Sequence, residues 1–409
     1  MTPAATQFQT TFDPDRLRRQ NVTARLLRYL FENFRPAAKL LRGLCPILRF
    51  RGYALVTRYD DVREVLTNDA VFGVPYRPKI EELTGANFML GMDDGPDYEA
   101  NAKLAMQAYK LSDIPAQANA AAQEAGAIVG AAQRELDAMG GLVTPLLVGI
   151  CERYYGVPVS DPSMFPLWAM AVSNYLFDAF PAAADAHAQA RAGAERLCAA
   201  VDEAIAGGPA ADTVLGRLLA AQAQANGVPD NQTIRTIIVS LVTAIVPTGT
   251  LAAGNMLEML LRRGDMMTAA REATGTGDDE LLSRCLFEAL RFMPISPFWR
   301  RDAKRDFFLA PGKRLPEGTH VLASTYSAMF DARQVRQPNR FDPTRPASDY
   351  MLFGHGLHYC LGGAFASAVI PAILKPLLLC RIVARAPGPR GQRAFFAIFP
   401  ERLFVTLQR

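Results

Sequence analysis

The sequence has no long apolar run and no secretion signal. No stretch reaches the roughly 18 uninterrupted apolar residues that cross a bilayer. Residues 1–19 are polar and lack the charged start, apolar middle and small-residue end of a signal peptide. These absences predict a cytoplasmic protein without a membrane anchor.

Paired cysteines are also absent. No CxxC pair occurs, which disfavours a structural zinc site and fits a reducing compartment. A free cysteine usually behaves as a small buried hydrophobe, so at most one of the six needs a special role. The six are Cys45, Cys151, Cys198, Cys285, Cys360 and Cys380.

Neither sign of charge is in clear excess. The 409 residues include 44 basic and 40 acidic ones, for a net charge of +4, and they are spread along the chain. This balance gives no reason to expect nucleic acid as the main partner. Hydrophobic residues make up 50% of the chain, which is enough for a globular core and excludes a mostly disordered protein.

Two long regions differ in residue pattern. From about residue 100 to 295, Ala, Leu and Glu recur at helical spacing, whereas residues 296–360 are dense in Pro, Gly, Arg and aromatic side chains. No repeat or low-complexity linker divides the chain. We therefore expect a mainly α fold in a single domain over residues 1–409, with a peripheral segment at about residues 1–45.

Small β elements are expected at two places. Residues 51–59 alternate like a strand and residues 60–66 continue with a helical period. Residues 307–309 and 319–322 are separated by turn residues and predict a second strand pair. The sheets are minor and lie at one side of the helical body.

The segment around Cys360 has the most specific pattern in the chain. Gly354 and Gly356 permit backbone turns that are closed to residues with a Cβ. Residues 364–379 then form a long apolar helix, which places the sulfur near a helix N-terminus. Unpaired N–H groups and the helix dipole favour a thiolate there, the form of cysteine that ligates iron.

A buried cysteine in a Gly-rich turn is the alternative interpretation of this segment. However, Phe353-Gly354-His355-Gly356-Leu357-His358-Tyr359-Cys360-Leu361-Gly362 resembles the cysteine-ligand loop of the cytochrome P450 family, Phe-Gly-x-Gly-x-His/Arg-x-Cys-x-Gly, at every defined position. The resemblance implies the P450 fold of the soluble bacterial type and haem b, iron protoporphyrin IX, as cofactor. It implies Cys360 as the metal ligand, with Phe353, Gly354 and Gly362 beside the haem.

Glu288 and Arg291 resemble the family's Glu-x-x-Arg helix motif. In the family this pair binds a further arginine from a loop before the cysteine, and the Pro-x-Arg-Phe resemblance of residues 338–341 makes that residue Arg340. An isolated Glu/Arg pair at this spacing is more often a solvated contact worth a few tenths of a kcal/mol. The resemblance implies a buried structural triad instead.

Haem propionates need charged or hydrogen-bonding partners. The resemblance implies His358 and one arginine of the pair Arg300 and Arg301, and the Arg-x-Ala pattern favours Arg301. A third partner in the family comes from His-x-x-x-Arg on a helix, and here the sequence departs from the pattern. Tyr98 replaces the histidine and Ala102 the arginine, so Tyr98 and Lys103 are the remaining candidates, against a plain surface helix.

Residues 233–261 resemble the long family helix that crosses the distal face of the haem. That helix usually carries an acid and an alcohol for proton transfer. Here Thr248 falls at the alcohol position, with Thr250 as a rival, while Pro247 replaces the acid. We expect the mid-helix proline to kink the chain and to open the helix locally.

The walls of the substrate pocket are assigned by position in the family. An aromatic stripe at helical spacing is more often core than pocket, so the assignment competes with simple packing. The candidates are Phe72, Phe88, Trp168, Tyr175 and Phe177, with Tyr76, Met89 and Phe180 in the same segments. A hydrophobic small molecule is the implied substrate.

Three functions remain open at this point. The leading one is a monooxygenase that takes electrons from a ferredoxin and its reductase. The missing acid favours a rival that uses peroxide, or that rearranges an oxygenated substrate, without external electrons. A haem sensor would need a sixth protein ligand, and only His187 and His320 lie outside the cysteine loop.

Overall fold

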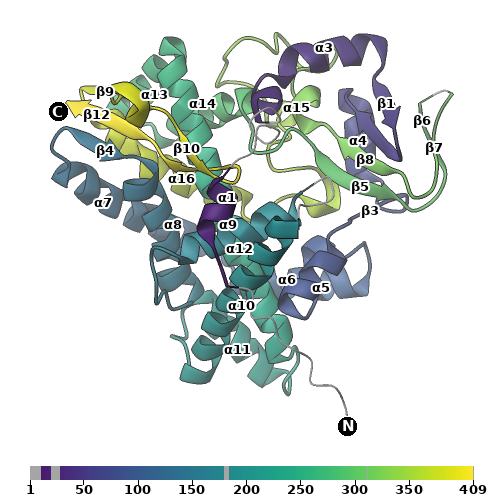
Figure 1. Cartoon of the computed structure of the whole chain (residues 1–409), viewed down its shortest axis with the longest axis horizontal. Helices are drawn as coiled ribbons and strands as arrows, with labels where there is room; N and C mark the ends of the chain where they lie inside the picture. Colours follow the sequence, from purple (N-terminus) through teal and green to yellow (C-terminus); the bar gives the residue numbers. More distant parts are fainter. Residues whose placement is uncertain (1–10, 20–27, 179–183, 311, 409) are drawn as a thin grey trace.

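Helices dominate this computed structural model, which describes residues 11–19, 28–178, 184–310 and 312–408 (Figure 1). The longest helix, α12, runs through the middle of the molecule and packs against α9, α10 and α14. The helices are α1 (Pro14–Arg18), α3 (Phe34–Leu44), α4 (Tyr59–Thr67), α5 (Arg77–Thr84), α6 (Pro96–Ala108), α7 (Ile114–Ala131), α8 (Thr144–Ile150), α9 (Phe165–Leu176), α10 (Ala184–Gly207), α11 (Val214–Gln224), α12 (Asn231–Arg262), α13 (Gly264–Thr276), α14 (Asp279–Phe292), α15 (Thr325–Ala328) and α16 (Gly363–Leu379).

The strands form small sheets. A five-stranded sheet has the order β1-β2-β8-β5-β3, with only the β2–β8 pair parallel, and a three-stranded sheet has the order β4-β12-β9. The strands are β1 (Ile47–Phe50), β2 (Tyr53–Val56), β3 (Phe72–Gly73), β4 (Glu135–Asp137), β5 (Trp299–Ala303), β6 (Phe307–Ala310), β7 (Lys313–Leu315), β8 (His320–Ala323), β9 (Ile382–Arg385), β10 (Ala394–Phe396), β11 (Phe399–Arg402) and β12 (Phe404–Gln408).

The predicted β elements are partly confirmed. The strand expected within residues 51–59 is β2, and the helix that follows it is α4. The predicted pairing of residues 307–309 with residues 319–322 is wrong. β6 pairs with the short strand β7, whereas β8 lies between β2 and β5 in the larger sheet. Turn residues alone could not show that β8 pairs with strands distant in sequence.

Helix α12 begins at a side-chain cap and is almost wholly buried. The carboxylate of Asp230 accepts a hydrogen bond from the Thr233 N–H at 2.8 Å, which satisfies one free donor of the first turn. The helix continues unbroken through Pro247, which is itself buried. Packing on the surrounding helices keeps the segment helical, and the kink and local opening expected at this proline stay a prediction.

Two segments are long and apolar enough to cross a membrane when only length and composition are considered. They are α12 and residues Gly356–Leu379, and 78% and 50% of their apolar windows are buried inside the protein. Buried core helices pass the same test, so this is weak evidence for a membrane span.

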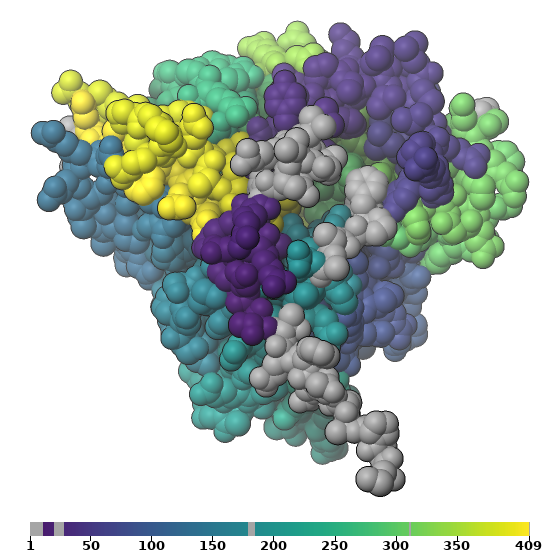
Figure 2. All heavy atoms as spheres, in the orientation of Figure 1, coloured from purple at the N-terminus to yellow at the C-terminus, as the bar shows by residue number. Residues whose placement is uncertain are grey.

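The two ends of the described chain meet on one face. Figure 2 shows α1 lying against the C-terminal segment. The Ala397 N–H donates to the Leu17 carbonyl at 3.1 Å, and Arg18 forms an ion pair with Glu401 at 2.5 Å. Leu17 also packs on a small apolar cluster that includes Leu251 of α12, so α1 covers part of the central helix.

Candidate active site

The Cys360 loop has the backbone geometry that its glycines predict. Gly354 and Gly356 have φ of +77° and +73°, in the left-handed region. A Cβ on Gly356 would lie 2.3 Å from the carbonyl oxygen of Leu66, so no larger residue fits. The Cys360 N–H donates to the Phe353 carbonyl at 2.9 Å, and α16 begins at Gly363. The loop therefore presents Cys360 just before a helix N-terminus.

The sulfur of Cys360 faces a cavity of about 260 Å³. Burial raises the pKa of the Cys360 thiol, and a hydrogen bond from the Gly362 backbone lowers it by less. In this structure burial therefore opposes the ionisation that the loop and the helix N-terminus favour. A bound metal ion would stabilise the thiolate further, because a coordinating thiol loses its proton.

The cavity lies between the Cys360 loop and α12. The segment that follows α14 and the chain around α5 complete its wall. Of the aromatic residues predicted for its wall, Phe88 and Phe177 lie on it, together with Tyr76 and Met89. Phe180 lies outside the described residues.

Three other predicted wall residues are absent from the wall. Phe72 is buried in β3 with its ring centroid 5.4 Å from that of Phe307. Trp168 packs against the core on α9, and the Tyr175 hydroxyl donates to Glu82 at 3.2 Å. These corrections share one cause, because an aromatic side chain at helical spacing packs on whichever neighbour the fold supplies.

Several wall residues were not predicted from the sequence. Trp299 and Ile295 follow α14, and Leu176 ends α9. Leu241 and Ile245 lie on α12 near Thr248, so a helical repeat counted back from Thr248 could have found them. No comparable signal exists for Trp299, whose position depends on the pairing of β5 with β8.

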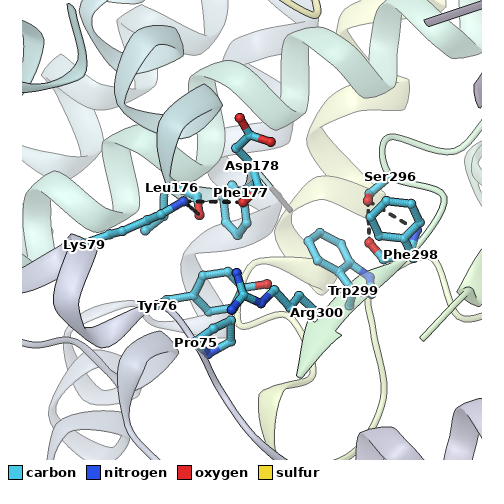
Figure 3. A pocket seen from close by; sticks show the side chains of 10 residues that line it. All are labelled: Pro75, Tyr76, Lys79, Leu176, Phe177, Asp178, Ser296, Phe298, Trp299 and Arg300. Atoms are coloured by element: carbon cyan, nitrogen blue, oxygen red, sulfur yellow. Dashed lines mark hydrogen bonds between the residues drawn. The ribbon is translucent and has the colours of Figure 1, made fainter. Parts of the chain in front are cut away.

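A smaller surface pocket adjoins the cavity (Figure 3). Tyr76, Leu176, Phe177 and Trp299 line both spaces. The rings of Tyr76 and Phe177 meet edge to face at 5.6 Å, and those of Phe177 and Trp299 at 5.8 Å. Lys79 donates to the Tyr175 carbonyl at 2.6 Å, which fixes α5 to the end of α9. The aromatic rings thus separate the apolar cavity from a polar rim.

Arg301 is buried on the cavity wall and is only 4% exposed. One guanidinium nitrogen donates to the Arg300 carbonyl at 3.0 Å, but the buried Nε has no partner within the described chain. Burial lowers the pKa of Arg301. An unpaired buried guanidinium N–H costs free energy unless an anion binds there, so Arg301 fits a carboxylate ligand.

Arg300 points elsewhere. Its guanidinium pairs with Asp302 at 3.1 Å and contacts His320 at 2.9 Å, and it lines the surface pocket rather than the cavity. Of the two arginines, the structure places only Arg301 on the cavity, as the Arg-x-Ala pattern favours.

His358 also lies on the cavity wall. Burial lowers its pKa to about 4, and the positive charge of Arg301 acts in the same direction. The ring is therefore neutral at physiological pH in a positive environment. An anion bound beside Arg301 would offset both effects.

The structure places neither Tyr98 nor Lys103 on the cavity, contrary to their prediction as propionate partners. The Tyr98 hydroxyl donates to the Leu357 carbonyl at 2.7 Å, and its ring contacts His358 edge to face at 5.5 Å. Tyr98 thus supports the His358 loop and does not line the cavity. Lys103 is exposed, because its place on α6 lies off the buried face formed by Tyr98, Ala102 and Ala105.

The residues on this cavity fit a haem. The walls are mainly apolar, one end offers the Arg301 and His358 donors, and a cysteine sulfur faces the space from a tight loop. A flat apolar group with two carboxylates and a thiolate-binding metal needs these features.

On α12 only one of the two predicted threonines lines the cavity. The Thr248 hydroxyl donates to the Ala244 carbonyl at 2.6 Å and lies on the wall. Thr250 is fully buried with its hydroxyl 3.4 Å from that of Thr144, and Pro247 is buried off the wall. Thr250 and Pro247 therefore do not contact the cavity. Within the described chain, no aspartate or glutamate lines this cavity.

The Glu288–Arg291 pair is fully buried and bidentate, with both N–O distances 2.8 Å. The third arginine is Arg345, whose Nε lies 3.1 Å from Glu288. Tyr350 adds a hydroxyl donor at 2.9 Å. The prediction of Arg340 is wrong, since its side chain is exposed and only its carbonyl accepts from Arg345, at 2.9 Å.

The turn after Arg340 explains this exchange. The Asp342 N–H donates to Glu288 at 3.0 Å, and Asp342 also accepts from the backbone of Thr344. This turn brings Arg345 to the carboxylate and leaves Arg340 outside.

Comparisons with known proteins agree on one family. A sequence profile described as cytochrome P450 matches residues 217–379. The cytochrome P-450 monooxygenase DoxA of Streptomyces sp. (strain C5) is 33% identical over 54% of this chain, and the chain spans about half of that protein, 51%. The mycinamicin IV hydroxylase/epoxidase of Micromonospora griseorubida is 26% identical over 82% of each chain. The nocardicin C N-oxygenase of Nocardia uniformis subsp. tsuyamanensis is 27% identical over 90% of each.

Solved structures give the same fold. The ligand-free cytochrome P450 TbtJ1 superposes with a TM-score of 0.74 at 25% identity, covering 92% of this chain and 97% of that one. CYP109E1 from Bacillus megaterium, in complex with testosterone, has a TM-score of 0.78 at 21% identity over 92% and 98% of the two chains.

Proposed function

Since this chain belongs to the cytochrome P450 family, we propose that it is a haem-thiolate monooxygenase that inserts one oxygen atom of dioxygen into a hydrophobic small molecule. Its relatives are named as monooxygenase, hydroxylase, epoxidase and N-oxygenase. The observation that carries the proposal is a cysteine sulfur facing a mainly apolar cavity whose wall also holds a buried arginine with an unpaired Nε.

The cofactor of this proposal is haem b, and Cys360 would supply the thiolate that binds its iron. Bound haem supplies the iron that activates dioxygen. Arg301 and His358 would hold the propionates, and Phe353, Gly354 and Gly362 would shape the loop beside the porphyrin. Tyr98 keeps His358 in place through the Leu357 carbonyl. Glu288, Arg291 and Arg345 hold the loop that leads to Cys360.

Thr248 is the distal alcohol. Its hydroxyl hydrogen is donated to a helix carbonyl, so its oxygen can accept a hydrogen bond from a water molecule in the cavity. Because no carboxylate lines the cavity in the described chain, water or a substrate hydroxyl completes the proton path. The missing acid argued for a peroxide-driven enzyme, but the names of the relatives favour the monooxygenase.

The proposed partners and place in the cell follow the family. A ferredoxin and its reductase supply electrons, and the enzyme acts in the cytoplasm. The substrate is a lipophilic small molecule, which the apolar wall around Phe88, Phe177 and Trp299 would enclose.

Replacement of the cysteine tests this function. Cys360→Ser should abolish the red-shifted Soret band of the ferrous–CO complex, because a serine oxygen lacks the electron donation of the thiolate sulfur that produces this band. Cys198→Ser is the matched control, since Cys198 is half-buried and lies off the cavity. A Cys360→Ser protein that keeps the red-shifted band would refute haem–thiolate ligation.

A further inference from the structure

Three hydroxyl side chains of α12 line the cavity: Ser240, Thr243 and Thr248. The hydroxyls of two of them donate hydrogen bonds to carbonyls of α12 itself. Thr243 donates to the Val239 carbonyl at 2.8 Å, and Thr248 donates to the Ala244 carbonyl at 2.6 Å. The Ser240 hydroxyl makes no hydrogen bond to any other described residue, and its side chain is half-buried at the cavity.

The other polar groups of the wall either have partners or lie outside α12, as Tyr359 of the Cys360 loop and Trp299 of β5 do. Arg301 and His358 belong to the propionate end of the site. Burial raises the pKa of Tyr76, and the Arg300 backbone near its hydroxyl lowers that pKa by less. Tyr109 lies beside Tyr155 with ring centroids 6.2 Å apart. Ser240 is therefore the free hydroxyl that α12 offers to a ligand, as far as the described chain extends.

Ser240 and Thr248 share one face of the helix. Ser240, Ala244 and Thr248 follow at intervals of four residues, and all three line the cavity. Eight residues at 1.5 Å each separate Ser240 from Thr248 by about 12 Å along the helix axis. An anchor at one end and the oxidation site at the other would fix the register of a bound molecule.

We propose that Ser240 determines specificity by hydrogen-bonding a polar group of the substrate. The substrate class is a mainly hydrophobic molecule with one hydroxyl, carbonyl or ether oxygen, located about 12 Å from the carbon that is oxidised near Thr248. This inference rests on the proposed function and deepens it. The rest of the wall around Leu241 and Ile245 is apolar, so a single hydrogen bond there is selective.

The test compares matched probes in matched variants. Isothermal titration of the haem-loaded protein measures the dissociation constants of octane, octan-1-ol, dodecane and dodecan-1-ol. For each length, the quantity compared is the alcohol-to-alkane affinity ratio. Ser240→Ala should lower this ratio for dodecanol by roughly fivefold, because one neutral hydrogen bond is lost. The affinity for the alkanes should not fall, since no apolar contact is removed.

Two further variants complete the design. Ser240→Thr keeps a hydroxyl and should restore most of the ratio. Ser367→Ala is the control, because Ser367 is a half-buried serine of α16 that does not line the cavity and whose hydroxyl makes no hydrogen bond to another described residue. Its ratio should equal that of the wild type.

Products provide a second readout. With dodecanol, the wild type should oxidise a narrow set of carbons and Ser240→Ala a broader one. An unchanged ratio and product pattern in Ser240→Ala would overturn the inference, as would a wild type that binds none of the four probes. The ferrous–CO spectrum is recorded for every variant. If the red-shifted Soret band is normal but the alcohol-to-alkane affinity ratio does not change, only the role of Ser240 is refuted. If the wild type shows no red-shifted Soret band, the proposed function is refuted.

Discussion

Arg301 shows how much a single side chain depends on its surroundings. Arg300 and Arg301 are neighbours in sequence, yet one pairs with Asp302 at the surface and the other is buried with a free donor on the cavity. Strand alternation explains the difference, since successive residues of β5 point to opposite faces.

Loss of the Arg301 guanidinium should weaken cofactor binding. Arg301→Ala removes a charge-assisted hydrogen bond to a propionate, and haem should leave the protein roughly tenfold faster or more. Transfer of haem to an excess of apomyoglobin measures this rate. Arg300→Ala is the control and should retain haem like the wild type. Equal rates in both variants would show that neither arginine holds a propionate.

Substitution of Thr248 should affect turnover, whereas substitution of Thr250 should affect stability. Thr248→Ala should lower the product formed per electron consumed at least roughly threefold, since the cavity hydroxyl that orders water is lost. Thr250→Ala should leave this yield unchanged and cost about 1 kcal/mol of unfolding free energy, because its hydroxyl faces Thr144. Coupling assays and urea unfolding of both variants check the pair. The reverse outcome would make Thr250 the distal alcohol.

At the level of elements, α12 carries a proline where helices disfavour one. Pro247 cannot donate to the Thr243 carbonyl, yet the helix continues on both sides. Burial of most of its length against neighbouring helices supplies the stability that the missing hydrogen bond does not.

Replacing this proline should stabilise the protein. Pro247→Ala restores a backbone N–H and removes a helix penalty of about 3 kcal/mol, against a loss of about 1.6 kcal/mol for two buried methylene groups. We expect a net gain of about 1 kcal/mol and a higher urea midpoint. Val246→Ala, which removes only buried side-chain atoms, should lower the midpoint. A similar loss in both variants would mean that the backbone hydrogen bond is not regained.

Across the whole molecule, the buried network around Glu288 joins α14 to the long segment that precedes Cys360. Arg345 reaches the carboxylate and also donates to the carbonyls of Arg336 and Gln337, at 2.6 and 2.7 Å. The network thus fixes the path of a region that has little regular secondary structure.

The two arginines of this segment offer a matched test. Arg345→Ala leaves a buried carboxylate with one partner fewer and should cost about 3–5 kcal/mol, seen as apoprotein or insoluble protein. Arg340→Ala removes an exposed side chain and should stay within about 0.5 kcal/mol of the wild type. Urea unfolding and haem content measure both. Equal tolerance of the two changes would show that the network is not essential to the fold.

What the sequence by itself determined is local. The positive φ of Gly354 and Gly356, the start of α16 just after Cys360 and the helical run around Thr248 all depend on residues close together in the chain. Backbone preference and helical period act over such short distances, so these features were predicted correctly.

The tertiary structure decided which distant residues meet. Arg345 rather than Arg340 reaches Glu288, Thr248 rather than Thr250 lines the cavity, and Trp299 joins a wall from which Trp168 is absent. Each of these choices depends on how a turn or helix is rotated against partners far away in sequence. Such rotation is set by the packing of the whole core, which no short segment encodes.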